Sequence, residues 1–468
     1  MQSDIRILDV VTTFSMERAR TPIKFGAVVM DSALLCQACV TVENGRGRIG
    51  VGWGDMFLAD FWAFPSEAVP HKQREQAMME LVRRCARLLA DYSGSGHPID
   101  IMRELEPGFD HLAEQVSAEL GLAEPLPRLA TLVCLSPLDA ALHDAFGLAN
   151  GIDSYAGYGP EFMAHDLSWY LGKDYQGLYP SQFLRPKYAE RVPIFHLVGG
   201  LDKLTRTELD DSDPNDGLPN CLQDWIERDG LYCLKVKLRG NDLDWDVERL
   251  LAVDAIAAEV LAKQGRDTWH LSADTNEVCD SPDYIIEMMA RVKAESTSAY
   301  KRVLYVEQPT ARDLQVAPHD MHALAEVVPV LADESLYDDE MFDLAIALGW
   351  SGPALKACKG QSHTILWLAK AAKLGLPYSI QDLTNPGLAL LQSVGLAAHS
   401  YPIMGVEYNS RQYFPWVSPE VRRVHPQAFT VVDGEVSTAS LRGPGLGFRM
   451  AEIQSQEALS LRLQESNR

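Results

Sequence analysis

Eight short apolar runs that alternate with helical stretches constrain the fold of this chain more than any other feature. The runs are VPIFHLV (192–198), YCLKVKL (232–238), WHLSADTN (269–276), VLYVEQPT (303–310), VPVLADES (328–335), PALKACK (353–359), PYSIQDL (377–383) and IMGVEYN (403–409). Helical periodicity between many of them predicts an α/β fold with a closed, TIM-like (β/α)8-type barrel. A doubly wound open sheet is the alternative, but no Gly-x-Gly-x-x-Gly turn follows an early strand.

The chain before these runs has a different pattern. Strand-like segments at 34–43 and 47–55 are interrupted by glycine and asparagine, and residues 66–92 have helical periodicity. We therefore expect residues 1–130 to form an α+β capping domain.

The segment SPLDAALHDAFG predicts the helix that enters the barrel domain, residues 131–414. Ser136 suits the N-cap, Pro137 the first helical position and Gly147 the end of the helix. The tail, residues 415–468, is expected to fold back and complete the first domain.

Two segments are additional to the strands, helices and loops of a minimal barrel. Residues 153–190 are rich in tyrosine and glycine, and residues 201–224 are acidic and rich in proline and asparagine. The second segment follows the first barrel strand, on the face where barrel loops carry function. It is either a lid or a tolerated insertion.

Composition excludes several classes of partner. The formal net charge of -23 argues against nucleic acid and against an anionic membrane surface. No run of about 18 apolar residues predicts a transmembrane helix, and the first residues lack the features of a signal peptide. The eight cysteines are interpreted as reduced thiols of a cytoplasmic protein, and the lone Cys-x-x-Cys at Cys36 and Cys39 predicts no metal site.

Three carboxylates end successive predicted strands: Asp274, Glu307 and Asp333. The carboxyl ends of barrel strands converge on one mouth, so these side chains would lie together and repel one another unless a cation joins them. Oxygen ligands suit Mg²⁺, with Mn²⁺ as the alternative. Asn276, two residues beyond Asp274, is a candidate substrate contact.

Lysines flank this predicted metal site. Lys235 and Lys237 share one face of their strand, because side chains alternate, and Lys356 and Lys359 end the sixth strand. Adjacent lysines beside a dication should push one another toward neutrality, and a neutral lysine can act as a general base. Lysines on opposite sides of the site could exchange a proton with both faces of one carbon.

This combination resembles the enolase superfamily, in its muconate-lactonizing-enzyme-like branch. The resemblance implies Lys237 and Lys356 as the acid/base pair with Lys235 beside them, and Asp274, Glu307 and Asp333 as the Mg²⁺ ligands. The seventh strand ends in Gln381 and Asp382 without a histidine, unlike the mandelate-racemase-like branch.

The same resemblance suggests where a substrate would be bound. Dipeptide epimerases of this branch carry Asp-x-Asp at the eighth strand, whereas this chain has Glu407 and Asn409 there. The further candidates for substrate contacts are Lys359, Gln381, Asp382, Arg20 and His196.

The resulting hypothesis is an enzyme that uses Mg²⁺ to remove a proton α to a carboxylate, most simply a racemase or epimerase of a small carboxylic or amino-acid-derived substrate. A syn-dehydratase or a cycloisomerase would use the same lysines. A Schiff-base aldolase would leave the carboxylates unexplained, and a non-catalytic metal-binding barrel would not need lysines on both sides. The oligomeric state stays open, a homo-oligomer included.

Overall fold

A computed structural model describes residues 1–25 and 28–455, so the last part of the predicted tail lies outside the described residues. The strands are β1 (Ile5–Phe25), β2 (Val28–Asn44), β3 (Ile49–Phe57), β4 (Arg191–Val198), β5 (Cys233–Lys237), β6 (His270–Asp274), β7 (Val303–Glu307), β8 (Val330–Ala332), β9 (Gly352–Lys356), β10 (Ser379–Gln381), β11 (Val406–Glu407) and β12 (Glu435–Ser437). The α-helices are α1 (Asp60–Ala63), α2 (His71–Ala90), α3 (Pro98–Glu119), α4 (Arg128–Asn150), α5 (Leu167–Leu171), α6 (Leu222–Asp229), α7 (Leu243–Lys263), α8 (Pro282–Glu295), α9 (Thr297–Arg302), α10 (His322–Ala325), α11 (Asp339–Ala347), α12 (Gln361–Leu374), α13 (Leu388–Ala398), α14 (Ser410–Tyr413) and α15 (Pro419–Val424).

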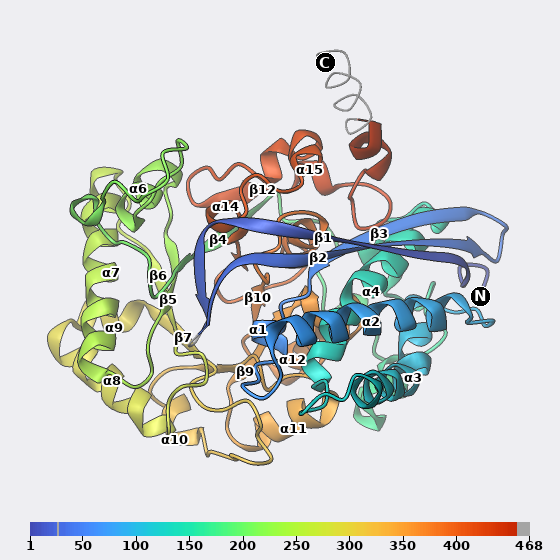
Figure 1. The fold of residues 1–468 in the computed structure, drawn as a ribbon, viewed down its shortest axis with the longest axis horizontal. Coiled ribbons are helices and arrows are strands. Elements are labelled where there is room, and N and C mark those ends of the chain that lie inside the picture. The colour runs from blue at the N-terminus through green and yellow to red at the C-terminus, as the bar shows by residue number, and fades with distance from the viewer. Residues whose placement is uncertain (26–27, 456–468) are drawn as a thin grey trace.

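The eight predicted barrel strands form a closed barrel, which confirms the predicted fold class. Strands β4 to β11 are parallel neighbours in chain order, and β11 pairs back with β4. In Figure 1 helices α6 to α9 lie on the outside of the barrel, and the long β1–β2 hairpin crosses in front of it.

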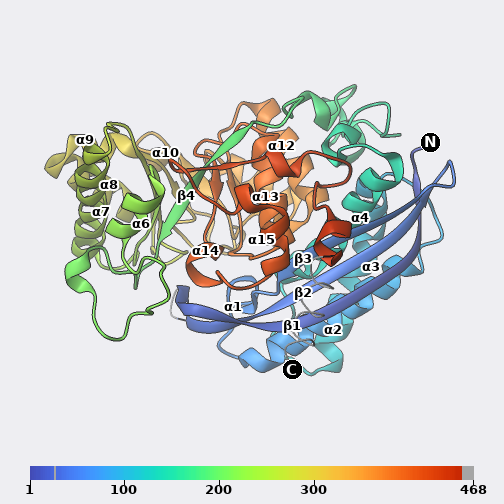
Figure 2. The ribbon, with the colours of Figure 1, turned by 90° about the horizontal axis from the view of Figure 1, so that it is seen from above.

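The capping domain is an antiparallel sheet, ordered β1-β2-β3, with helices packed on one face. Figure 2 shows α2 and α3 alongside this sheet. Helix α4 approaches β3 so closely that a Cβ at Gly52 would lie 2.1 Å from the carbonyl oxygen of Ala141. The glycines of β3 therefore permit backbone contact between the sheet and α4.

The helix predicted from Ser136 is longer than expected: α4 begins at Arg128 and ends at Asn150. Pro137 lies inside it and lacks the N–H that would bond to Val133, and the Ser136 hydroxyl donates to that carbonyl oxygen instead, at 2.8 Å. In the described chain α4 is the one helix long and apolar enough to span a membrane, yet 94% of that window is buried inside the molecule.

The tail contacts both parts of the molecule. Strand β12 pairs antiparallel with the first half of β4, and the Leu446 N–H donates to Asp144 of α4 at 2.7 Å. The tail therefore extends the barrel sheet as well as contacting α4.

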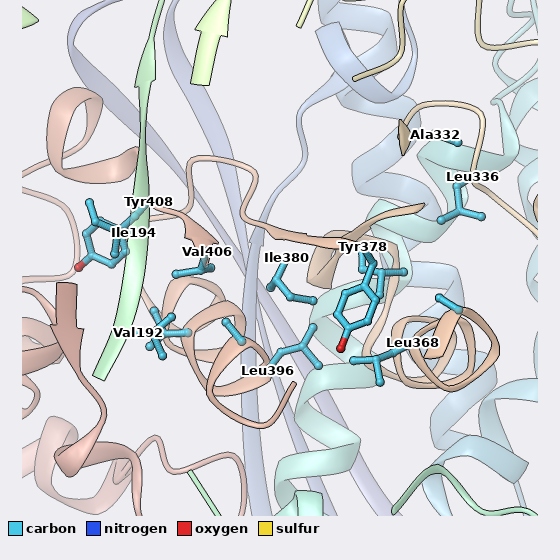
Figure 3. Packing of buried hydrophobic residues seen from close by; sticks show 14 of the residues in the cluster. Val192, Ile194, Ala332, Leu336, Leu368, Tyr378, Ile380, Leu396, Val406 and Tyr408 are labelled. Atoms are coloured by element: carbon cyan, nitrogen blue, oxygen red, sulfur yellow. The ribbon is translucent and has the colours of Figure 1, made fainter. Parts of the chain in front are cut away.

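Barrel side chains alternate between two cores. Outward-facing residues such as Ile194, Ile380 and Val406 pack against the surrounding helices (Figure 3). A small inner cluster fills the lower part of the barrel with Phe195, Cys233, Tyr305, Leu331 and Met404. Polar side chains on the inner face can therefore lie only above this cluster, at the carboxyl ends of the strands.

Candidate active site

The inner faces of β5, β6 and β7 carry the predicted lysines and two of the carboxylates in register. Lys237 pairs with Asp274, and Asp274 pairs with Glu307. Side chains at paired positions of parallel strands point to the same face, so these three residues converge at the mouth. Asp333 follows β8 directly and meets the group from the other side.

Lys235 lies at the centre of the site and is only 1% exposed. Its Nζ is 2.7 Å from Glu307 Oε1, 3.0 Å from Asp274 Oδ2 and 3.6 Å from Glu407 Oε2. Burial lowers the pKa of this lysine, but the three carboxylates raise it well above its ordinary value. The three acids around Lys235 therefore favour its charged form.

The other lysines divide between two carboxylates. Lys237 donates to Asp274, whereas Lys356 Nζ lies 2.6 Å and Lys359 Nζ 3.2 Å from oxygens of Asp333. Lys359 also donates to the backbone carbonyl oxygen of Asp333. The site thus contains two lysine–aspartate groups, and Lys235 extends the Asp274 group to Glu307.

The carboxylates differ in how firmly they hold their charge. Burial raises the pKa of Asp274 and of Asp333, yet their lysine partners outweigh it and hold both pKa values below the ordinary range. Burial raises the pKa of Glu307 to about 7, against the charge of Lys235. Glu307 is thus the carboxylate that most needs further positive charge.

This donor set fits a hard divalent cation. Three buried carboxylates on neighbouring strands supply the oxygen ligands that Mg²⁺ prefers. Their ligand atoms do not all lie within 4.8 Å of one another, because the lysines bridge and occupy them.

A second group in the described chain, Asp60, His71 and Glu75, does meet that spacing. There, however, His71 is exposed and Glu75 partly exposed, whereas all three barrel carboxylates are buried. The barrel carboxylates remain the stronger candidates for a metal site.

The ends of β10 and β11 line the remaining side of the mouth. Gln381 Nε2 donates to Glu307 Oε2 at 2.5 Å, which makes it a support of a predicted ligand. Asn409 Nδ2 donates to Glu407 Oε1 at 2.6 Å. Glu407 Oε2 and Asn409 Oδ1 are buried and have no hydrogen-bond partner among the described residues. These two acceptors could receive N–H or O–H groups of a ligand.

Two of the predicted substrate contacts, Asp382 and His196, have partners within the protein. Asp382 accepts hydrogen bonds from Asn385 and Ser393, so its carboxylate stabilises the loop after β10. His196 is on the outer face of β4, because its neighbour Phe195 points inward, and its Nδ1 accepts from Arg411 at 2.8 Å.

Arg20 joins two segments that the sequence left unrelated. Its guanidinium lies 2.6 Å from Asp216 and 2.5 Å from Asn220, both in the segment 201–224. The β1–β2 hairpin is thereby tied to that insertion. Arg20 is consequently a structural link, with its charge already paired.

Asn276 borders an open part of the mouth. With Lys237, Leu201, Arg239 and Trp245 it lines a cavity of about 450 Å³. Its backbone has a φ of 47° and its N–H donates to Asp274 at 2.8 Å. This turn directs the Asp274 carboxylate and leaves space beside Lys237.

The structure adds a residue that the sequence interpretation missed. Trp62 of α1 places its ring 4.8 Å from Lys356 Nζ and donates from Nε1 to Glu334 Oε1 at 2.9 Å. Burial next to Asp333 raises the pKa of Glu334 to about 8. Glu334 was visible beside Asp333 in the sequence, but nothing there linked Trp62 to the barrel.

Sequence comparison identifies the family. Residues 218–454, just over half of the chain, match the sequence profile described as enolase C-terminal domain-like. The chain therefore belongs to the enolase superfamily, in the branch of mandelate racemases and muconate lactonizing enzymes. No curated protein matches it in sequence.

Solved structures agree with this fold at low sequence identity. An enolase from Bradyrhizobium in complex with magnesium and mandelic acid has a TM-score of 0.60 and 17% identity, over 97% of this chain and 99% of that one. The L-Ala-D/L-Glu epimerase from Bacillus subtilis has a TM-score of 0.57 and 14% identity, over 94% of this chain and 98% of that one. A muconate lactonizing enzyme from Pseudomonas fluorescens, with muconolactone, has 0.56 and 16%, over 94% and 95%.

Proposed function

We propose that this chain is a Mg²⁺-dependent isomerase that removes the proton α to a carboxylate and returns it on the opposite face. The observation that supports this is the position of Lys237 on β5 and Lys356 on β9, four strands apart in an eight-stranded ring. The predicted metal ligands lie between them. The substrate class would be a small carboxylic or amino-acid-derived compound.

Each group then has a defined task. Asp274, Glu307 and Asp333 would hold Mg²⁺, which supplies a positive charge for the substrate carboxylate and for the negative charge that develops when the proton leaves. Lys237 Nζ takes or gives the proton on one face, and Lys356 Nζ does so on the other. Lys235 orients Asp274 and Glu307, to both of which it is paired.

The eighth strand supports a substrate that carries a hydrogen-bond donor. Glu407 Oε2 and Asn409 Oδ1 accept no hydrogen bond in the described chain, although Lys235 Nζ lies 3.6 Å from Glu407 Oε2. Leaving a buried acceptor without a hydrogen bond costs about 1–3 kcal/mol. An amino, amide or hydroxyl group near the reacting carbon would satisfy them. Since all eight cysteines are free, the proposal places this activity in the cytoplasm.

The test is α-proton exchange in deuterated water, followed by NMR. The panel contains N-acyl amino acids, amino-acid betaines, hydroxyprolines, dipeptides and sugar acids, each as both stereoisomers, with Mg²⁺ or with EDTA. We expect exchange that requires Mg²⁺. In Lys237→Ala and Lys356→Ala we expect it to fall by about 10²–10⁴-fold for one stereoisomer each, in opposite senses.

Other outcomes would redirect the assignment. Loss of a β-substituent without return of the proton would indicate a syn-dehydratase, and ring opening or closure a cycloisomerase. Borohydride trapping that EDTA leaves unaffected would indicate a Schiff base. Tight Mg²⁺ binding without exchange of any compound would contradict the proposed isomerase and favour a non-catalytic barrel.

A further inference from the structure

Helix α4, which packs on the capping sheet, is bonded to the segment that carries Lys356. Asp139 on α4 accepts two hydrogen bonds from Ser362, one from its backbone N–H at 2.8 Å and one from Oγ at 2.7 Å. Ser362 is the second residue of α12, and both side chains are at most 1% exposed. Asp139 therefore caps α12, which starts five residues after Lys356, from a different part of the fold.

The chain between Lys356 and this cap has little freedom. Gly360 has a φ of +92°, and a Cβ there would lie 2.8 Å from Asp139 Oδ2. Thr364 Oγ1 donates to the carbonyl oxygen of Lys356 at 3.0 Å. A shift of the cap would consequently be transmitted to the lysine backbone.

The surrounding network fixes Asp139 in turn. His143 Nε2 lies 2.9 Å from Ser362 Oγ, and its Nδ1 lies 2.9 Å from the Tyr158 hydroxyl. Gln361 Nε2 donates to the same hydroxyl at 3.1 Å. Aspartate, histidine and serine meet here as in a hydrolase, but they are completely buried, so their arrangement serves packing and no substrate reaches the serine.

We propose that Asp139 is a positioning residue for Lys356, so that a helix packed on the capping sheet sets one of the two proton-transferring lysines. Lys237, by contrast, is on β5 and donates to Asp274 on β6, both barrel strands. The catalytic part of this inference rests on the proposed function, whereas the positioning itself can be measured without a substrate.

The first test is hydrogen–deuterium exchange by mass spectrometry on the full chain, comparing Asp139→Asn with Asp144→Asn. Asp139→Asn removes the negative charge and leaves one oxygen acceptor, so the two charge-assisted bonds from Ser362 are weakened. We expect amide exchange in residues 356–364 to rise about tenfold while residues 233–237 stay unchanged. Asp144 is an equally buried acid of α4 that bonds Trp53 and Leu446, so its variant should leave 356–364 unchanged.

Ser362→Ala keeps the backbone bond to Asp139 and loses only the one from Oγ. It should show a smaller rise than Asp139→Asn, and it provides the test if the latter does not fold. Unchanged exchange at 356–364 in both variants, or an equal rise in Asp144→Asn, would overturn the positioning role.

The second test applies the stereoisomer panel described above. Asp139→Asn should slow α-proton exchange about tenfold for the stereoisomer that needs Lys356 and leave the other unchanged. Equal slowing of both would contradict a lysine-specific role. Absence of exchange in the wild type would instead contradict the proposed function, while the amide measurement would still decide the positioning of the Lys356 segment.

Discussion

The two sides of the barrel mouth are built from different parts of the molecule. On the β5 side, Lys237 is paired with Asp274 and borders a cavity of about 450 Å³ lined by barrel loops and Leu201. On the β9 side, Lys356 is paired with Asp333 and covered by the ring of Trp62 from α1. Lys237 thus lines a cavity, whereas Lys356 lies under an aromatic ring of the capping domain.

This difference indicates separate requirements for the two halves of the proposed reaction. A substrate can approach Lys237 through the cavity, whereas Lys356 depends on Trp62 and on the bonds that Ser362 donates to Asp139. Changes in the capping domain should therefore affect the proton transfer of Lys356 first. The predictions below test this asymmetry.

The largest effect is expected from the carboxylate on the enclosed side. Asp333→Asn removes the carboxylate partner of both Lys356 and Lys359. Asp274→Asn removes the carboxylate partner of Lys237 but leaves Lys235 its bond to Glu307. Breaking a buried ion pair typically costs about 3–5 kcal/mol. In urea unfolding with EDTA present, we expect Asp333→Asn to lose about this much and Asp274→Asn clearly less. The reverse order would contradict the difference between the sides.

A smaller effect is expected from Trp62→Phe. The ring over Lys356 is kept, but Glu334 loses its indole donor, which costs about 1–3 kcal/mol. Trp367→Phe is the matched control, because its buried Nε1 donates to Asp339 at 2.8 Å away from the mouth. Both variants should lower the melting temperature, and only Trp62→Phe should slow exchange at the Lys356 face. An equal slowing by both variants would show that Trp62 acts through general stability.

The open side can be tested through Arg20. Arg20→Ala removes the bonds that hold segment 201–224 to the β1–β2 hairpin. Their loss should lower the free energy of opening this segment by about 1 kcal/mol, which raises the opening equilibrium constant about fivefold. Limited proteolysis should therefore cut that segment about fivefold faster. Arg6→Ala, which removes the exposed pair with Glu43 on the same hairpin, should not change the rate. Equal rates in both variants would mean that Arg20 does not hold the insertion.

The barrel was predictable because its signal is local. Each strand is a short apolar run between turn residues, and the polar residue at each carboxyl end needs only chain order to reach the mouth. The start of α4 was not predictable from the usual helix signals. Ser136 and Pro137 resemble an N-terminus, yet the Ser136 hydroxyl compensates for the proline inside a helix that is almost entirely buried.

Contacts between distant segments were the part that local patterns could not reveal. Arg20 was interpreted as a substrate contact. Its actual partners are about 200 residues away, in an insertion of unknown position, so no local pattern could reveal them. His196 was assigned to the mouth from its place near a strand end, whereas alternation puts it on the outer face. Because Phe195 points into the barrel, the next residue along the strand, His196, must point outward.

The smallest effect concerns the two acids of α4 and tests whether they differ as their bonds suggest. Burial raises the pKa of Asp144 to about 7 in the folded protein, so its folded state binds the proton more tightly than the unfolded chain, whose value is about 4. Its contribution to the free energy of unfolding is thus present at low pH and is lost as the pH rises from about 4 to 7. Asp139 has a pKa below its ordinary value, because His143 and Ser362 outweigh its burial, so its contribution is lost on acidification. Melting temperatures at pH 5 and 8 should therefore move closer together in Asp144→Asn than in the wild type. A pH dependence unchanged by Asp144→Asn would show that this acid keeps its ordinary charge in the folded protein.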